Sequence, residues 1–186
     1  MIRSILAAVL GVAAISVLAA PARADLVSGT ITGVSTLTPT STPGIYVVSF
    51  TGNGTDTTFG DFSVTSSSSG DFINPPNIVI TDGMFSESFT GGGSLFGTSS
   101  GSGTANGAGS AALTLNYVVK GGSGAFAGDI GKIAITGTLT TVTATTEAFD
   151  GTYSGSLTAT PEPAMFVPLA PMVLLLLWRI RSPQAG

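Results

Sequence analysis

The 186-residue chain contains no histidine and no cysteine, which excludes Ser-His-Asp and Cys-His nucleophiles, imidazole or thiolate zinc sites, and disulfides. Four of its six basic residues lie in the terminal segments, so residues 25–159 carry nine carboxylates against two lysines, a net charge of −7. A surface with so few cations cannot neutralise phosphates, and neither nucleic acid nor anionic lipid is expected as a partner.

The N-terminal segment has the order of a secretory signal peptide. Arg3 supplies a positive start, residues 5–20 are almost wholly apolar, and Ala22-Arg23-Ala24 is a small-x-small cleavage site before Asp25. Residues 1–24 are therefore predicted to be a signal helix that is removed during export, with Ala22, Ala24 and Asp25 marking the cleavage site. The alternative is an anchor that is not cleaved.

Residues 25–159 have the composition of one all-β domain. About half of them are Ser, Thr or Gly. Gly and Thr disfavour helix, whereas Thr suits a pleated surface. Residues 100–110, rich in Gly and Ser, are predicted to form a flexible loop. Strand-like runs are predicted at residues 26–37, 45–50, 58–65, 78–81, 84–89, 94–99, 112–119, 130–146 and 152–159.

Two Asp-Gly pairs are predicted to be turns. Asp82-Gly83 separates two apolar alternating runs, a pattern that favours a two-residue hairpin because both turn positions need positive φ. Asp150-Gly151 is predicted to turn the chain into the last strand. About eight short strands at hairpin spacing predict a single antiparallel barrel, with a β-sandwich as the alternative, because closure removes exposed sheet edges.

A glycine-rich stretch at residues 121–131 reads Gly-Gly-Ser-Gly-Ala-Phe-Ala-Gly-Asp-Ile-Gly, and residues 150–155 read Asp-Gly-Thr-Tyr-Ser-Gly. Both resemble segments of small secreted bacterial β-barrels that are similar to the allene oxide cyclase barrel. The resemblance implies the barrel fold and does not by itself imply cyclase activity. Phe126 is predicted to plug one barrel end. Phosphate binding is disfavoured, because the Lys and Ser/Thr order of a P-loop is missing.

The carboxylates show no catalytic or metal-binding pattern. Asp56 and Asp61 lie five residues apart around Gly60, but the Asp-x-Asp-x-Asp spacing of a calcium-binding loop is absent. Glu87 with Glu147 is a conceivable glycosidase pair, yet residues 25–159 contain no Trp to serve as a sugar platform. We therefore predict no catalytic, cofactor-binding or metal-binding residue. Alternation along the strand places Ile133 and Ile135 inward and Lys132 outward, toward solvent.

The last 27 residues, 160–186, combine Pro161-Glu162-Pro163, an apolar run over residues 164–178, and Arg179 with Arg181. This order resembles the PEP-CTERM sorting signal of Gram-negative bacteria. The resemblance implies a hydrophobic helix in the inner membrane, recognition near the tripeptide by an exosortase-type membrane protease, and the two arginines as a cytoplasmic stop-transfer signal. The run is shorter than the roughly 20 residues of an ordinary span. A buried core helix is the alternative.

Together these features predict a non-catalytic protein that crosses the inner membrane, is transiently anchored there, and is then released to the cell surface or extracellular matrix. Its expected partners are the secretion machinery, an exosortase-type protease and exopolysaccharide of a biofilm, and no cofactor is expected. One alternative is a barrel that binds or isomerises a small apolar ligand, although the mainly aliphatic and aromatic inward positions favour a filled interior. Another is a calcium-stabilised adhesion module.

Overall fold

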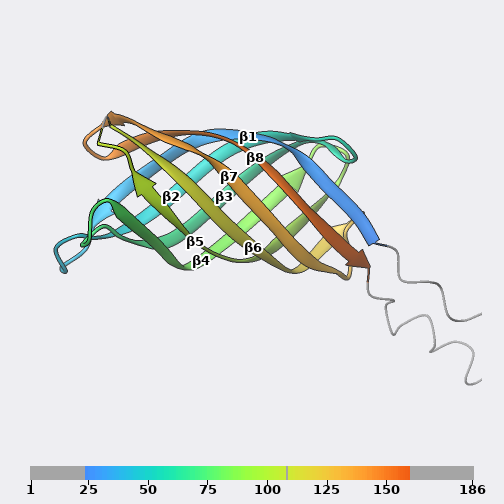
Figure 1. Cartoon of the computed structure of the whole chain (residues 1–186). Helices are drawn as coiled ribbons and strands as arrows, with labels where there is room; N and C mark the ends of the chain where they lie inside the picture. The colour runs from blue at the N-terminus through green and yellow to red at the C-terminus, as the bar shows by residue number, and fades with distance from the viewer. Residues whose placement is uncertain (1–23, 108, 160–186) are drawn as a thin grey trace, which may run out of the picture.

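The computed structural model describes residues 24–107 and 109–159, which form a closed antiparallel β-barrel (Figure 1). Strands that are neighbours in sequence are neighbours in the barrel, and β1 pairs with β8 to close it. The barrel prediction is thereby confirmed over the sandwich. The eight strands are β1 (Ala24–Pro39), β2 (Ile45–Asp56), β3 (Gly60–Asp71), β4 (Asn77–Phe89), β5 (Gly93–Ala105), β6 (Ser110–Gly124), β7 (Asp129–Thr143) and β8 (Thr146–Ala159).

The two predicted targeting segments lie almost entirely outside the described residues. Ala22, Pro161, Glu162, Pro163, Arg179 and Arg181 are not described, and neither are the helices predicted for the two ends. Ala24 and Asp25 are described, and they open β1 opposite Thr158 and Leu157 of β8. Residues 24–107 and 109–159 contain no helix long and apolar enough to cross a membrane.

Alternation along the strands separates an apolar interior from a hydroxyl-bearing exterior. Tyr117, Ile133 and Ile135 are buried as predicted, and Lys132 is exposed as predicted. On the outside, Thr30, Thr152, Thr136 and Thr114 face one another across four neighbouring strands. Threonine suits such positions because its branched side chain fits the pleat while its hydroxyl stays in water.

Aromatic rings fill the interior by lying over inward-facing glycines. A Cβ atom added to Gly33 would lie 2.6 Å from the Phe50 ring, and one added to Gly137 would lie 2.6 Å from the Phe149 ring. At Gly97 the nearest side-chain atom would be Phe85 Cε1, at 2.9 Å. Each ring therefore occupies the space that a neighbouring side chain would take, which lets a narrow barrel hold several large side chains.

The predicted hairpin at Asp82-Gly83 was wrong, because β4 runs unbroken from Asn77 to Phe89. Asp82 has the expected positive φ of 52°, but it serves a β-bulge: the pairing of β4 with β5 shifts register between Ile80 and Gly83. The apolar runs on both sides of the bulge pair with the same two strands, β3 and β5. A bulge keeps both runs facing inward within one strand.

One further predicted turn and one predicted loop were also wrong. Asp150-Gly151 lies inside β8, where Gly151 packs so closely that a Cβ would lie 2.8 Å from the Phe149 ring. The predicted loop at residues 100–110 is mostly strand, since β5 continues to Ala105. Gly101 and Gly103 of this segment face leucine side chains of β6: Leu115 Cδ2 would lie 2.7 Å from a Cβ at Gly101, and Leu113 Cδ1 would lie 3.1 Å from a Cβ at Gly103. Neighbouring strands thus supply the apolar core that this Gly/Ser segment lacks.

Candidate functional site

One end of the barrel is closed by a cluster of aromatic rings. Here lie both ends of the described chain and the turns that connect β2 to β3, β4 to β5 and β6 to β7 (Figure 1). Phe126 is only 1% exposed, and its ring centroid lies 4.6 Å from that of Phe89 and 4.8 Å from that of Phe59. The prediction that Phe126 plugs a barrel end is confirmed, with the difference that Phe59 and Phe89 share the task.

Asp56 fixes the β2–β3 turn at this closed end. Its Oδ1 accepts hydrogen bonds from the backbone N–H groups of Thr58 (2.6 Å) and Phe59 (2.8 Å). Its Oδ2 accepts from the N–H of Ser28 (3.0 Å) and the hydroxyl of Tyr153 (2.5 Å). These four donors give Asp56 a structural task. Residues 24–107 and 109–159 bring no three His, Cys, Asp or Glu side chains together as a metal site.

A second buried carboxyl, Glu87, lies in the barrel interior and is 2% exposed. Burial, and to a lesser extent the charge of Asp56, raises its pKa to about 7. Burial also raises the pKa of Tyr117, as does the charge of Glu87, while a hydrogen bond with Ser66 lowers it. The Tyr117 ring stacks on Phe85 at 4.1 Å between centroids.

No positive charge compensates the interior carboxylates of the described barrel. Lys120 and Lys132 are the only basic residues between residues 24 and 159, and both are exposed on the outside. Glu87 therefore sits in an acidic interior, where its neutral form is favoured below neutral pH.

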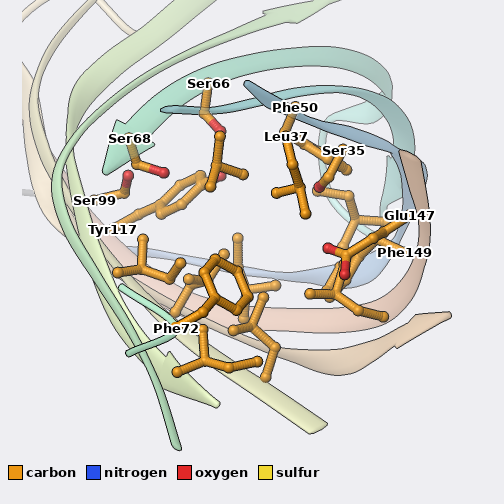
Figure 2. Close-up of a pocket in the computed structure, with 18 residues that line it drawn as sticks. Ser35, Leu37, Phe50, Ser66, Ser68, Phe72, Ser99, Tyr117, Glu147 and Phe149 are labelled. Atoms are coloured by element: carbon orange, nitrogen blue, oxygen red, sulfur yellow. The ribbon is translucent and has the colours of Figure 1, made fainter. Parts of the chain in front are cut away.

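The opposite end of the barrel holds a cavity, which Figure 2 shows with its lining residues. Most of the lining is aliphatic or aromatic, including Leu37, Phe50 and Ile135. Leu37, Phe72 and Glu147 are only partly buried, so the cavity reaches solvent at this end. The polar side chains of the lining are Ser35, Ser66, Ser68, Ser99, Tyr117 and Glu147.

The cavity is narrow. The volume open to the centre of a water molecule is about 40 Å³. A single water needs roughly 10–15 Å³ by that measure. The cavity can therefore take a few waters or a thin apolar chain, and a bulky ring system would need the lining to move.

Glu147 gives this cavity its only ionisable carboxylate. It lies opposite Ser35 in the β1–β8 register, and its side chain points into the cavity from one wall while Tyr117 and Ser99 lie on the other (Figure 2). Burial raises the pKa of Glu147 above its ordinary value. A half-buried carboxylate beside apolar walls favours a cation or a hydrogen-bond donor as its partner.

The structure does not bring the conceivable glycosidase pair together as one site. Glu147 lines the cavity, whereas Glu87 does not contribute to the lining, and its electrostatic neighbour is Asp56. Asp61 is the second carboxylate of the calcium alternative. It accepts a hydrogen bond from the Thr55 hydroxyl at 2.9 Å. The cavity serines were not anticipated from the sequence. A signal existed at Ser35, which continues the inward alternation of Val27 and Ile31.

The chain was compared with protein-family models, curated proteins and solved structures. Nothing matches. The candidate site is therefore defined by this chain's own residues. Its serines have no histidine beside them, and a tyrosine of raised pKa stays protonated at neutral pH. These groups are suited to hydrogen bonding with a bound molecule. The expectation that the barrel is not an enzyme stays a prediction.

Proposed function

We propose that the barrel is a non-catalytic binding protein whose open-end cavity holds a small, largely apolar molecule. The observation that carries the proposal is the uneven filling of the interior: aromatic rings close one end, and the other end contains a cavity that reaches solvent. Eight-stranded barrels are wide enough for one small ligand when their side chains leave room.

The lining suits such a molecule in two ways. Apolar side chains of the lining, such as Leu37 and Ile135, favour the transfer of an apolar chain from water. The hydroxyl groups and the Glu147 carboxylate offer a few polar contacts that can fix its orientation. Because the cavity is narrow, a straight alkyl chain fits it better than a fused ring.

The test is a melting experiment on the full chain, expressed with both of its own ends, with 1-decanol as the probe. Binding to the folded state raises the melting temperature as the decanol concentration rises. Ser68→Phe places a ring in the cavity and should abolish this shift. Ser67→Phe is the matched control, because its side chain is exposed on the outer face of the same strand, β3.

The expected result is a concentration-dependent shift in the wild type and in Ser67→Phe, and none in Ser68→Phe. Equal shifts in both variants would place the decanol elsewhere, and no shift in the wild type would reject the proposal. Native mass spectrometry of the protein purified from its host supplies an independent readout: a co-purifying apolar mass that is lost in Ser68→Phe supports the cavity.

We also propose that the protein is exported and sorted to the cell surface or the extracellular matrix. Support comes from the signal-peptide order of residues 1–24 and from the PEP-CTERM-like order of residues 160–186, with an exosortase-type protease and the inner membrane as partners. The geometry is compatible, since Ala24 and Ala159 both lie at the closed end (Figure 1). A tail held in a membrane would leave the cavity mouth pointing away from it.

Exopolysaccharide is a further proposed partner, and a groove on the outside of the barrel offers contacts for it. The groove crosses β1 to β4. Besides Gly54 and Phe62, its lining consists of short polar side chains: Thr30, Thr32, Asn53, Thr55, Asp61, Ser63, Ser88 and Thr90. Thr32, Asn53 and Ser63 form one cross-strand row. Hydroxyl and amide groups in such a row can exchange hydrogen bonds with a polyhydroxylated chain.

Deleting residues 161–186 and fractionating the cells tests the sorting proposal. Loss of surface and matrix delivery, with the barrel remaining in the periplasm or the medium, is expected. A barrel-surface variant, Thr136→Val, controls for general effects of mutation on export. Unchanged delivery of the deleted form would reject the sorting proposal and leave the ligand proposal untouched.

A further inference from the structure

We infer that the molecule bound in the open-end cavity is an amine with a thin apolar chain and not a carboxylic acid. The inference rests on the proposed binding function and adds the charge of the ligand's head group. It is carried by the position of Glu147 in the cavity and by the distribution of charge inside the barrel.

Glu147 lies at the junction of two hollows. It lines the interior cavity, and it also lines a second hollow at the same end of the barrel, where Gly107 and Gly109 of the β5–β6 turn and Thr141 of β7 form part of the wall. Phe72, Ile78 and Leu139 are likewise common to both hollows. A molecule whose chain enters the interior would therefore place its head group beside the Glu147 carboxylate.

The charges of the barrel select the sign of that head group. The described interior contains Glu87 and Glu147, and the two lysines of the barrel are exposed on its outer surface. A carboxylate head would meet Glu147 as a like charge with no cation nearby, which costs free energy in a half-buried site. The neutral hydroxyls of Ser35 and Tyr117 could donate hydrogen bonds to the carboxylate head of the ligand, but these bonds cannot offset its repulsion by Glu147.

An ammonium head has complementary interactions at the same place. It can donate to the Glu147 carboxylate and to the Oγ of Ser35, which faces Glu147 across the β1–β8 pair. Its chain would then run along Phe50 and Ile135 toward Tyr117. The ligand's ammonium and the Glu147 carboxylate would both stay partly exposed, so neither group loses all of its hydration.

The experiment compares three probes with the same ten-carbon chain: decylamine, 1-decanol and decanoate. Each is titrated into the full chain by calorimetry at pH 7.5 and 0.15 M salt, below its aggregation concentration. Salt at this level confines exposed charge effects to about 8 Å, which suppresses attraction from the barrel's overall net charge. We expect decylamine to bind at least tenfold more tightly than decanoate, with decanol between them.

Glu147→Gln should abolish the amine preference, so that this variant binds decylamine and decanol with equal affinity. Asp150→Asn is the matched control: it makes the same change in net charge on the same strand, at an exposed outward position, and should keep the amine preference. Glu147→Asp keeps the charge and should also retain the preference, which guards against a folding defect in the glutamine variant.

The outcomes separate the two proposals. If none of the three probes binds, the proposed binding function fails. If they bind but decanoate or decanol binds as tightly as decylamine, the binding function stands and the amine inference is overturned. An amine preference that persists unchanged in Glu147→Gln would also overturn it, because the barrel's overall charge would then be the cause.

Discussion

The two ends of this barrel are built from the same strands yet are filled differently. At the closed end, the rings of Phe59, Phe89 and Phe126 meet at centroid distances between 4.6 and 6.1 Å. At the open end, the corresponding inward positions include serines, such as Ser35 and Ser68, and a cavity remains. One strand framework is thus closed by aromatic rings at one end and leaves a cavity between its side chains at the other.

The largest effect is expected from Phe126→Ala, which removes the central ring of the closed end. Truncating a fully buried Phe costs about 4 kcal/mol, because apolar contacts are lost and a void is left. Phe72→Ala, at the rim of the cavity, should cost only about 1 kcal/mol, because Phe72 is partly exposed. Urea denaturation of both variants measures the contrast, and equal losses would contradict a structural division between the ends.

The next largest effect is the pH dependence caused by Glu87. Its pKa is about 7 in the fold against an ordinary 4.5, so the folded state binds this proton more tightly than the unfolded state. The resulting stabilisation is fully present below pH 4.5 and is lost as the pH rises through 7, a change of about 3 kcal/mol. In Glu87→Gln the free energy of unfolding should change much less between pH 5 and pH 8 than in the wild type.

Asp61→Asn is the control for that measurement, because Asp61 is an exposed carboxylate. The control should keep the decline of stability with rising pH. If the stability of Glu87→Gln declines with pH as steeply as that of the wild type, a group other than Glu87 causes the pH dependence.

A smaller loss is expected from Tyr153→Phe at the closed end. The Tyr153 hydroxyl donates to the buried Asp56 carboxylate at 2.5 Å, and hydrogen bonds to charged groups contribute about 2 kcal/mol. The ring stays, so packing against Phe62 is preserved. Thermal unfolding measures the loss, and an unchanged melting temperature would show that the three backbone donors suffice for Asp56.

The smallest effect is expected from Ser66→Ala at the open end. This change removes the hydrogen bond between the Ser66 and Tyr117 side chains, a neutral pair that contributes about 1 kcal/mol. Urea denaturation measures the loss of stability. A loss larger than that of Tyr153→Phe would reverse the expected ranking of the two ends.

Much of the fold could be predicted from the sequence because strand alternation is a local signal. The inward positions of Tyr117 and Ile133 follow from period two alone. The turns could not be predicted so well. The Asp82-Gly83 pair has the chemistry of a hairpin turn, and only its pairing with both β3 and β5 shows that it is a bulge. That information is non-local.

The cavity was harder to anticipate for the same reason. A serine such as Ser99 in a Gly/Ser-rich segment carries no sign of facing inward, and its position follows from a register set by β4 and β6. The sequence presents Glu147 only as a conceivable partner for Glu87. Its placement over the cavity depends on β8 closing against β1, a contact between the first and last strands.

That closing contact has a consequence for how the molecule is made. The pairing of Ala24 with Thr158 joins the two extremes of the described chain, so the ring cannot be completed until the final 14-residue strand has emerged. Until then β1 and β7 each present an unpaired edge, to which strands of other molecules could add. During synthesis from the N-terminus there is therefore an interval in which these edges can pair with other molecules, and it ends when the last strand docks.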